Sequence, residues 1–289
     1  MPTNSRTTQP RAEHVLLALL LLATIASVSS SARRQQSEMA VRFGAAPAKL
    51  LRKVCLVEAA KDRFAVYTLT FANPDGVTTL GVRIDAGDVV KVCVPNFKPK
   101  SYSMSAERPG EFDITFKVYP GGRCSGYLDS LELGQSAEVF KMGRKQRVAG
   151  THVGIVAYGV GITEALPIAT AELAKPEATH VDLLWASKTF GDTFWHEQLA
   201  ELAAVHPERF KHTTILSRET RDGALHGRVN SRVLAAVFDD AWATGVGAPN
   251  ENLRESVRFL SVGTKAMMHE TDEMLTANGY HWAKNKLLQ

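Results

Sequence analysis

Residues 152–173 read HVGIVAYGVGITEALPIATAEL, and this stretch decides the fold of the second half of the chain. Its first seven residues are typical of a buried strand, and a helical pattern runs from Thr163 to Leu173. Between them, Gly159 and Gly161 form a glycine turn. Glycines there let a phosphate approach the N–H groups that begin a helix, but they also suit a tight turn without a ligand. The stretch alone leaves both interpretations open.

Outward from this stretch, strands and helices continue to alternate. Further strands are expected at 180–186, 210–216 and 258–262, and helices at 193–205, 230–238 and 265–277. This alternation predicts a parallel sheet with helices on its faces. Ligands of such sheets bind beyond the carboxyl ends of the strands.

The first half has a different rhythm. Segments rich in β-branched and aromatic residues occur at 54–60, 64–71, 88–94 and 112–118, and turn sequences separate them. They predict an antiparallel sheet or barrel. The fold class is therefore α+β with two domains, an antiparallel β-barrel followed by a Rossmann-like α/β domain. The expected boundaries are 1–40 for an N-terminal segment, 41–148 for the barrel and 149–289 for the α/β domain.

Composition narrows the possible functions. The 289 residues carry a net charge of +4, which is too small an excess to indicate a nucleic-acid partner. The three cysteines, Cys55, Cys93 and Cys124, are scattered and form no disulfide framework or zinc motif. The nine histidines show no metal-ligand spacing. We therefore expect neither a metal nor a nucleic-acid partner.

The N-terminal segment contains fourteen apolar or nearly apolar residues at 15–28. It has three interpretations: a membrane anchor, an organelle import signal, or a cleaved secretory signal. Arg33, Arg34 and later basic residues on its C-terminal side favour an anchor with the large domains facing the cytosol. The expected location is therefore the endoplasmic reticulum or mitochondrial membrane, with import into an organelle as the alternative.

Three motifs in order carry a family resemblance. They are Lys100-Ser101-Tyr102-Ser103, the segment FKVYPGGRCSGYL at 116–128, and GVGIT at 159–163. Their order and spacing resemble the ferredoxin–NADP reductase superfamily, and most closely its NADH–cytochrome-b5 reductase branch. The resemblance covers about residues 50–289. It implies a barrel that binds FAD and an α/β domain that binds NAD(P).

The resemblance implies roles for individual barrel residues. It places Tyr102 against the flavin ring, Ser103 near the flavin N5 atom, and Lys100 where the family has an arginine at the pyrophosphate. The pyrophosphate cradle would consist of Gly121, Gly122, Arg123, Cys124 and Ser125. Lys117 and Tyr119 would flank the ribityl or adenine side of FAD. Ordinary sheet packing for Tyr119 and a solvated strand face for Lys117 remain open alternatives.

In the second domain the resemblance implies a nicotinamide dinucleotide site. Gly159 and Gly161 would hold its pyrophosphate, Gly263 would lie at the last strand, and Thr163 would lie close to both rings. Ser103 and Thr163 are the candidate catalytic residues. Asp192 would repel a 2′-phosphate and favour NADH over NADPH. An aspartate here also suits the N-cap of the helix expected at 193–205.

Two positions depart from the family pattern. Glu164 follows Thr163 where the family has proline, and this carboxylate is expected near the nicotinamide or a phosphate. The family's Cys-Gly-Pro-Pro is replaced by Val262-Gly263-Thr264-Lys265. Because hydride transfer is the chemistry of the cofactors, the loss of that cysteine should slow turnover rather than abolish it.

Two functions follow from the resemblance and its departures. The first is an FAD-dependent oxidoreductase that passes electrons from NADH to a one-electron acceptor, a haem protein such as cytochrome b5. The alternative is a flavin-binding protein without turnover that acts as a membrane-associated assembly or interaction partner.

Overall fold

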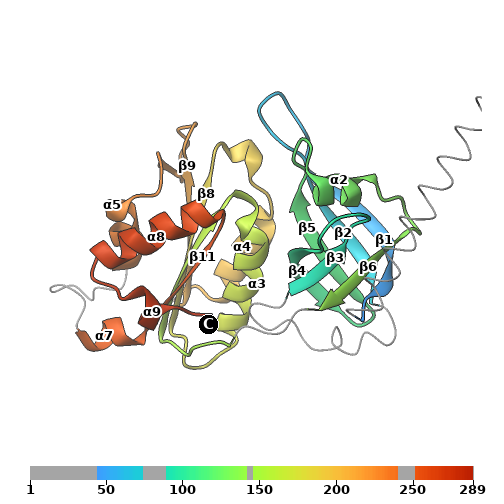
Figure 1. Cartoon of the computed structure of the whole chain (residues 1–289). Coiled ribbons are helices and arrows are strands. Elements are labelled where there is room, and N and C mark those ends of the chain that lie inside the picture. Colours follow the sequence, from blue (N-terminus) through green and yellow to red (C-terminus); the bar gives the residue numbers. More distant parts are fainter. Residues whose placement is uncertain (1–43, 74–88, 142–145, 240–250, 289) are drawn as a thin grey trace, which may run out of the picture.

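The computed structural model of the chain describes residues 44–73, 89–141, 146–239 and 251–288. They form two domains, a barrel and a sheet covered by helices (Figure 1). The apolar segment at 15–28 lies outside the described residues. Within the described ranges, no helix is both long and apolar enough to cross a membrane.

The first domain is a closed antiparallel barrel with strand order β1-β2-β5-β4-β3-β6. Its strands are β1 (Ala46–Val57), β2 (Val66–Ala72), β3 (Val89–Cys93), β4 (Lys100–Arg108), β5 (Glu111–Lys117) and β6 (Ser136–Lys141). Antiparallel pairing of β1 with β6 closes the barrel. Alternate side chains such as Leu69, Phe112 and Ile114 point inward and are fully buried. The short helix α2 (Arg123–Ser130) packs against this core through Cys124 and Leu128.

The second domain contains a parallel sheet with strand order β10-β9-β8-β7-β11. Its strands are β7 (His152–Tyr158), β8 (His180–Ser187), β9 (Phe210–Leu216), β10 (Leu225–His226) and β11 (Val257–Val262). The α-helices are α3 (Ile162–Leu173), α4 (His196–Val205), α5 (Ser231–Leu234), α7 (Glu251–Ser256), α8 (Lys265–Ala277) and α9 (Trp282–Asn285). Short helical turns lie at η1 (Gly159–Gly161), η2 (Phe190–Asp192) and η3 (Ala235–Asp239). The predicted two-domain fold is confirmed.

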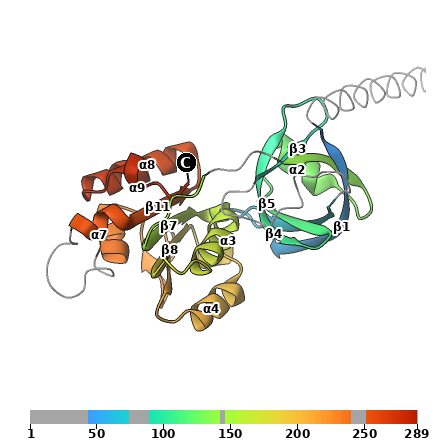
Figure 2. The ribbon, with the colours of Figure 1, turned by 90° about the horizontal axis from the view of Figure 1, so that it is seen from below.

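Helices cover both faces of the sheet, with α3 and α4 on one side and α8 on the other (Figure 2), and α5 packs on the same side as α8. Successive side chains of each strand point to opposite faces of the sheet, so both faces present apolar side chains to the helices. Ile155 of β7 faces the α3 side, whereas Val156 joins the cluster that contains Leu234 of α5 and Leu275 of α8. Because both faces are buried, the strands read as nearly continuous apolar runs.

The barrel and the α/β domain share an apolar core. Val57 of β1 and Val66 of β2 belong to the cluster that contains Ile162 and Leu166 of α3. Helix α3 lies between the parallel sheet and the barrel in Figure 1. The site between the domains is therefore positioned by packed side chains as well as by the linker.

Two predicted helices differ from those observed. The helix expected at 193–205 begins only at His196, because Trp195 takes a left-handed φ of 59° at its N-cap. Thr193 and Phe194 are buried ahead of it. The helix expected at 230–238 is a short α5 followed by a π-helical turn, η3, and Asn230 caps α5 by accepting from two backbone N–H groups.

A buried ion pair connects the interdomain linker to α3. The guanidinium of Arg147 contacts both carboxylate oxygens of Glu172 over 2.5 Å, and Glu172 is fully buried. The Glu172 hydrogen bonds raise the pKa of Arg147. Arg147 also reaches the more exposed Glu177 over 3.0 Å. Removing one partner of a buried ion pair is costly, because the other charge is then left buried without a partner or water around it.

We predict that Glu172→Ala lowers the free energy of unfolding by about 3 kcal/mol, because it leaves Arg147 without its buried partner. Urea denaturation followed by circular dichroism measures this change. Glu177→Ala is the matched control, and little change is expected because that carboxylate is largely solvated. Equal destabilisation by the two variants would contradict the assignment.

Candidate functional site

Strand β4 and the start of α2 form the barrel side of the site. Burial raises the pKa of the Tyr102 hydroxyl, and the neighbouring Cys124 thiol raises it further. The Tyr102 ring lies edge-on to Phe116 at 6.2 Å. Burial raises the pKa of the Cys124 thiol, and the nearby Lys100 ammonium partly offsets this rise. The structure thus brings three predicted residues together: Lys100, Tyr102 and Cys124.

The turn before α2 has the form of an anion cradle. Gly121 adopts a φ of +67° with open space where a Cβ would point. At Gly122 an added Cβ would come within 2.9 Å of the Tyr119 carbonyl oxygen and would also meet Ser125. The Ser125 hydroxyl accepts from the Tyr119 N–H over 3.2 Å. No side chain caps the N-terminus of α2, so its first N–H groups remain available to an anion.

The remaining predicted barrel residues lie towards the α/β domain. Lys117 is the last residue of β5, and burial lowers the pKa of its ammonium. The nearby Asp192 carboxylate raises this pKa, and the Lys188 ammonium lowers it. The exposed Tyr119 ring lies edge-on to Phe64 at 5.8 Å. Lys117 therefore lies at the domain boundary rather than on an open solvated strand face.

Asp192 makes its contacts within its own turn. Its Oδ2 accepts from the Thr189 hydroxyl over 2.8 Å and from the Thr189 N–H over 3.2 Å. The second of these bonds is one half of a capping box on η2, and the Asp192 N–H donates to the Thr189 side chain in the other half. The interpretation of Asp192 as N-cap of the long helix is wrong, because α4 begins later and its N-cap is Trp195.

The glycine turn after β7 is held by two contacts that the sequence did not reveal. Trp185, fully buried in β8, donates its Nε1–H to the Gly159 carbonyl over 2.8 Å. Gly161 packs against the end of β11, where an added Cβ would lie 2.5 Å from the Val262 carbonyl oxygen. Gly159 has a φ of +54° with open space beside it. Thr163 follows in the first turn of α3 and is buried.

Gly263 lies directly after β11, beside the aromatic ring of Tyr158 at the end of β7. An added Cβ would meet the Tyr158 ring at 2.9 Å. The Tyr158 hydroxyl is hydrogen-bonded to Thr271 of α8 over 2.7 Å, which fixes the ring in place. Gly159, Gly161 and Gly263 thus meet at the carboxyl edge of the parallel sheet, where ligands of such sheets bind.

One candidate catalytic residue, Ser103, bonds across the domain boundary to the residue that follows the other, Thr163. Ser103 of β4 donates its hydroxyl proton to Glu164 of α3 over 2.8 Å. Glu164 is the residue after Thr163, so this bond places Ser103 next to the first turn of α3. The sequence marked Glu164 as a departure but gave no sign of its partner, because the pair is 61 residues apart.

Two family models match the two domains in order. The oxidoreductase FAD-binding domain matches residues 60–141, and the oxidoreductase NAD-binding domain matches residues 155–273. The chain belongs to the ferredoxin–NADP reductase superfamily. The resemblance drawn from the three motifs is confirmed, and so is the assignment of FAD and NAD(H) as cofactors.

Curated relatives include NADH-cytochrome b5 reductase 1 of Dictyostelium discoideum, with 29% identity over 207 residues, 68% of this chain and 65% of the relative. The enzyme of that name from Bos taurus is 33% identical over 162 residues, 46% of this chain and 50% of the relative. A component of the 1,2-phenylacetyl-CoA epoxidase of Escherichia coli is 28% identical over 179 residues, 59% of this chain and 48% of that component. The similarity thus spans about half to two thirds of these relatives.

Solved structures share the fold at low identity. The cytochrome b5 reductase domain of Ulva prolifera nitrate reductase has a TM-score of 0.65 at 19% identity and covers 84% of this chain and 96% of that domain. A ferredoxin NADP+ reductase from Neisseria gonorrhoeae has a TM-score of 0.63 at 18% identity and covers 84% of this chain and 95% of its own.

The residues present fit the cofactors of this superfamily. The open glycine turn, the uncapped helix start and the nearby Lys100 form an electropositive cradle suited to a pyrophosphate. Tyr102 supplies an aromatic ring beside it. The exposed Arg123 lies over the Phe97 ring at 4.4 Å and adds a second positive charge.

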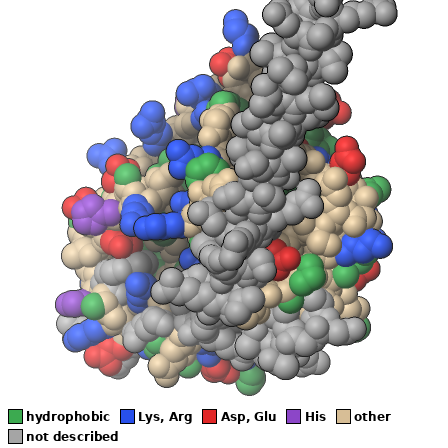
Figure 3. Space-filling view, turned by 45° about the vertical axis from the view of Figure 1, so that its right-hand side comes forward, with side chains coloured by type: hydrophobic (Ala, Val, Ile, Leu, Met, Phe, Trp, Pro, Cys, Tyr) green, Lys and Arg blue, Asp and Glu red, His purple; other side chains and the backbone are tan. Residues whose placement is uncertain are grey.

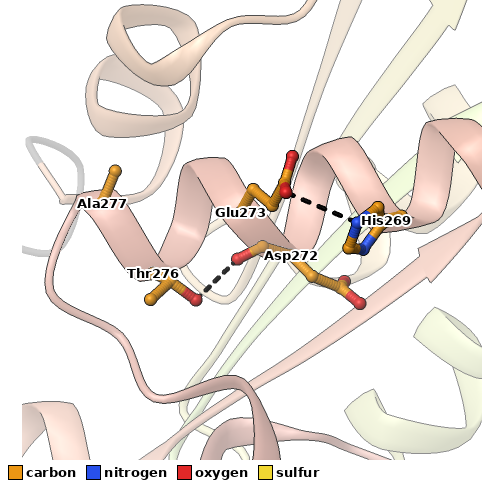
Figure 4. Close-up of a pocket in the computed structure, with 5 residues that line it drawn as sticks. All are labelled: His269, Asp272, Glu273, Thr276 and Ala277. Carbon is orange, nitrogen blue, oxygen red and sulfur yellow. Dashed lines mark hydrogen bonds and ion pairs between the residues drawn. The ribbon is translucent and has the colours of Figure 1, made fainter.

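A shallow hollow elsewhere on the surface contains none of the predicted residues. It lies along α8 and is lined by His269, Asp272, Glu273, Thr276 and Ala277 (Figure 4). His269 pairs with Glu273 one turn later over 3.4 Å. Within the described part of the chain, no group of three His, Cys, Asp or Glu side chains could hold a metal ion.

We predict that Gly122→Ala reduces FAD affinity by roughly tenfold, about 1.4 kcal/mol, because its Cβ would displace Ser125 and the Tyr119 carbonyl from the cradle. Flavin absorbance per chain during equilibrium dialysis measures this loss. Gly126→Ala, one turn later in α2, is the matched control, since nothing lies within 4 Å of its Cβ position. Undiminished FAD binding by the folded Gly122→Ala variant would place the pyrophosphate elsewhere.

Proposed function

We propose that this chain is an NADH-dependent flavin reductase whose electrons leave one at a time to a haem protein of the cytochrome b5 kind. One observation carries the proposal. The Ser103–Glu164 hydrogen bond joins the barrel, which holds the proposed FAD cradle, to the α/β domain beside its glycine turn. Bound FAD supplies the means to accept a hydride and release single electrons. The protein contributes binding and orientation.

Each domain has a separate task in this proposal. The turn before α2 binds the FAD pyrophosphate, with Lys100 and Arg123 balancing its charge. The turn before α3 binds the dinucleotide pyrophosphate, and Trp185 holds that turn rigid through the Gly159 carbonyl. Val57 and Val66 fix one domain against the other, so both ligands face the same edge of the parallel sheet.

Surface charge supports a protein acceptor. Lys and Arg side chains gather in the upper left part of the face shown in Figure 3. Lys98, which is not assigned to the pyrophosphate, is exposed on the barrel directly after Phe97, the residue whose ring lies against Arg123. Positive charges around the flavin site would steer an acidic electron acceptor towards it. We further propose that residues 15–28 anchor the chain to a membrane with both domains on the cytosolic side.

A second candidate function keeps the flavin without turnover. Val262 replaces the cysteine of the family pattern, and Glu164 replaces its proline. A chain that binds FAD but no longer accepts hydride would act as an assembly or interaction partner. The two candidates differ in one observable, which is whether a nicotinamide dinucleotide reduces the bound flavin.

We predict that the flavin bands of the purified full-length chain bleach on anaerobic addition of NADH, and more slowly on addition of NADPH. The second half of this prediction rests on Asp192, a carboxylate near the domain boundary that repels a 2′-phosphate. Stopped-flow absorbance measures both rates. Flavin bands that persist with either dinucleotide would refute the reductase proposal in favour of the interaction partner.

We predict that Gly161→Ala weakens NADH binding by roughly tenfold without loss of FAD, because its Cβ would push the turn away from the Val262 carbonyl. The concentration dependence of flavin bleaching gives the apparent NADH affinity. Gly126→Ala again serves as the control, because it lies in the barrel domain with open space beside it. Unchanged NADH affinity in Gly161→Ala would remove this turn from the dinucleotide site.

A further inference from the structure

The hydrogen bond between Ser103 and Glu164 joins the two domains at the proposed flavin site. The Ser103 hydroxyl donates to Glu164 Oε2 over 2.8 Å, and both residues are half-buried. Glu164 lies in the first turn of α3, where the helix dipole favours a negative charge. The dipole and the Ser103 hydroxyl therefore both stabilise the carboxylate.

The direction of this bond determines what Ser103 can offer to a ligand. A serine hydroxyl has one proton and two lone pairs, whereas a carboxylate has only acceptor sites. Because the hydroxyl donates its single proton in the hydrogen bond to Glu164, it has only lone pairs to offer to a second partner. Without Glu164, the hydroxyl would rotate and could donate its proton to any nearby acceptor.

This difference matters at the flavin, and here the inference rests on the proposed function, which places Ser103 beside N5. In oxidised flavin N5 carries no proton and accepts hydrogen bonds, whereas in the two-electron-reduced form N5 carries a proton and donates. A hydroxyl restricted to accepting therefore pairs with the reduced form and offers nothing to the oxidised form.

We propose that Glu164 is a positioning residue that holds the Ser103 hydroxyl as a hydrogen-bond acceptor and so favours reduced flavin. The family pattern has proline here, and a proline side chain has no atom that could accept this proton. The arrangement is therefore a property of this chain. It also fixes the start of α3, and with it the preceding glycine turn, relative to β4.

A double-mutant cycle on the full-length chain tests the proposal through the midpoint potential of the bound flavin, measured by dithionite titration. In an S103A background, E164A removes only a negative charge, which makes the potential less negative. With Ser103 present, E164A also frees the hydroxyl. The freed hydroxyl can donate to N5 of oxidised flavin, which lowers the midpoint potential. The E164A shift with Ser103 present should therefore be about 30 mV more negative than the E164A shift in the S103A background, which is about a tenfold change in the two-electron equilibrium.

Two further variants separate charge from orientation. E164Q keeps an accepting oxygen without the charge, so its shift with Ser103 present should match that of E164A in the S103A background. E197A removes an exposed first-turn glutamate from α4 and should leave the potential unchanged. Equal E164A shifts with and without Ser103 would overturn the proposal, because Glu164 would then act on the flavin directly. Unchanged potentials in every variant would overturn it as well.

Failure of the proposed function gives a different result. Dithionite reduces the flavin without NADH. The midpoint potentials of the wild-type chain, S103A, E164A and the double variant can therefore be measured even if NADH does not reduce the flavin. Coupling between the variants in such a chain would support the role of Glu164 while refuting the reductase. A chain that binds no flavin at all would overturn both proposals.

Discussion

The packing of the first turn of α3 against the barrel is the constraint on which the site depends. A parallel sheet presents its ligand site at the carboxyl ends of its strands, and helices begin there. The barrel must meet that edge for two cofactors to touch. Val57 and Val66 supply the apolar part of this contact, and Ser103 with Glu164 supplies a polar part. Apolar burial gives the contact its strength, and the hydrogen bond gives it a defined register.

The sequence predicted those parts of the fold that depend on local pattern. Residues 152–158 and 210–216 form strands with the expected bounds, because their runs of apolar and β-branched residues are typical of buried strands. The helix at 265–277 also has its expected bounds, because Thr264 caps it. The predicted start of α4 is wrong, because Thr193 and Phe194 are buried ahead of the helix and its N-cap, Trp195, adopts a left-handed conformation that tryptophan does not favour.

Motifs in the sequence named the glycines of the proposed site, but contacts between distant side chains were missed. Gly121 and Gly122 were named through the family resemblance, and Gly159 and Gly161 also through the strand-to-helix turn. In the structure all four lie at turns or close approaches that favour glycine. Trp185 was missed, because its indole bonds to a backbone carbonyl and leaves no motif. Glu164 was recognised only as a departure from the family pattern. Its partner lies in the other domain, so only the folded chain explains how a carboxylate is accommodated there.

The central claim is that a hydride from NADH becomes two single electrons within this chain. The most direct measurement is the stoichiometry of acceptor reduction by the full-length chain, with limiting NADH and excess cytochrome b5 under anaerobic conditions. Since a hydride carries two electrons and a haem accepts one, the account predicts two cytochrome molecules reduced for each NADH consumed. NADH oxidation without cytochrome reduction, or no oxidation at all, would contradict it.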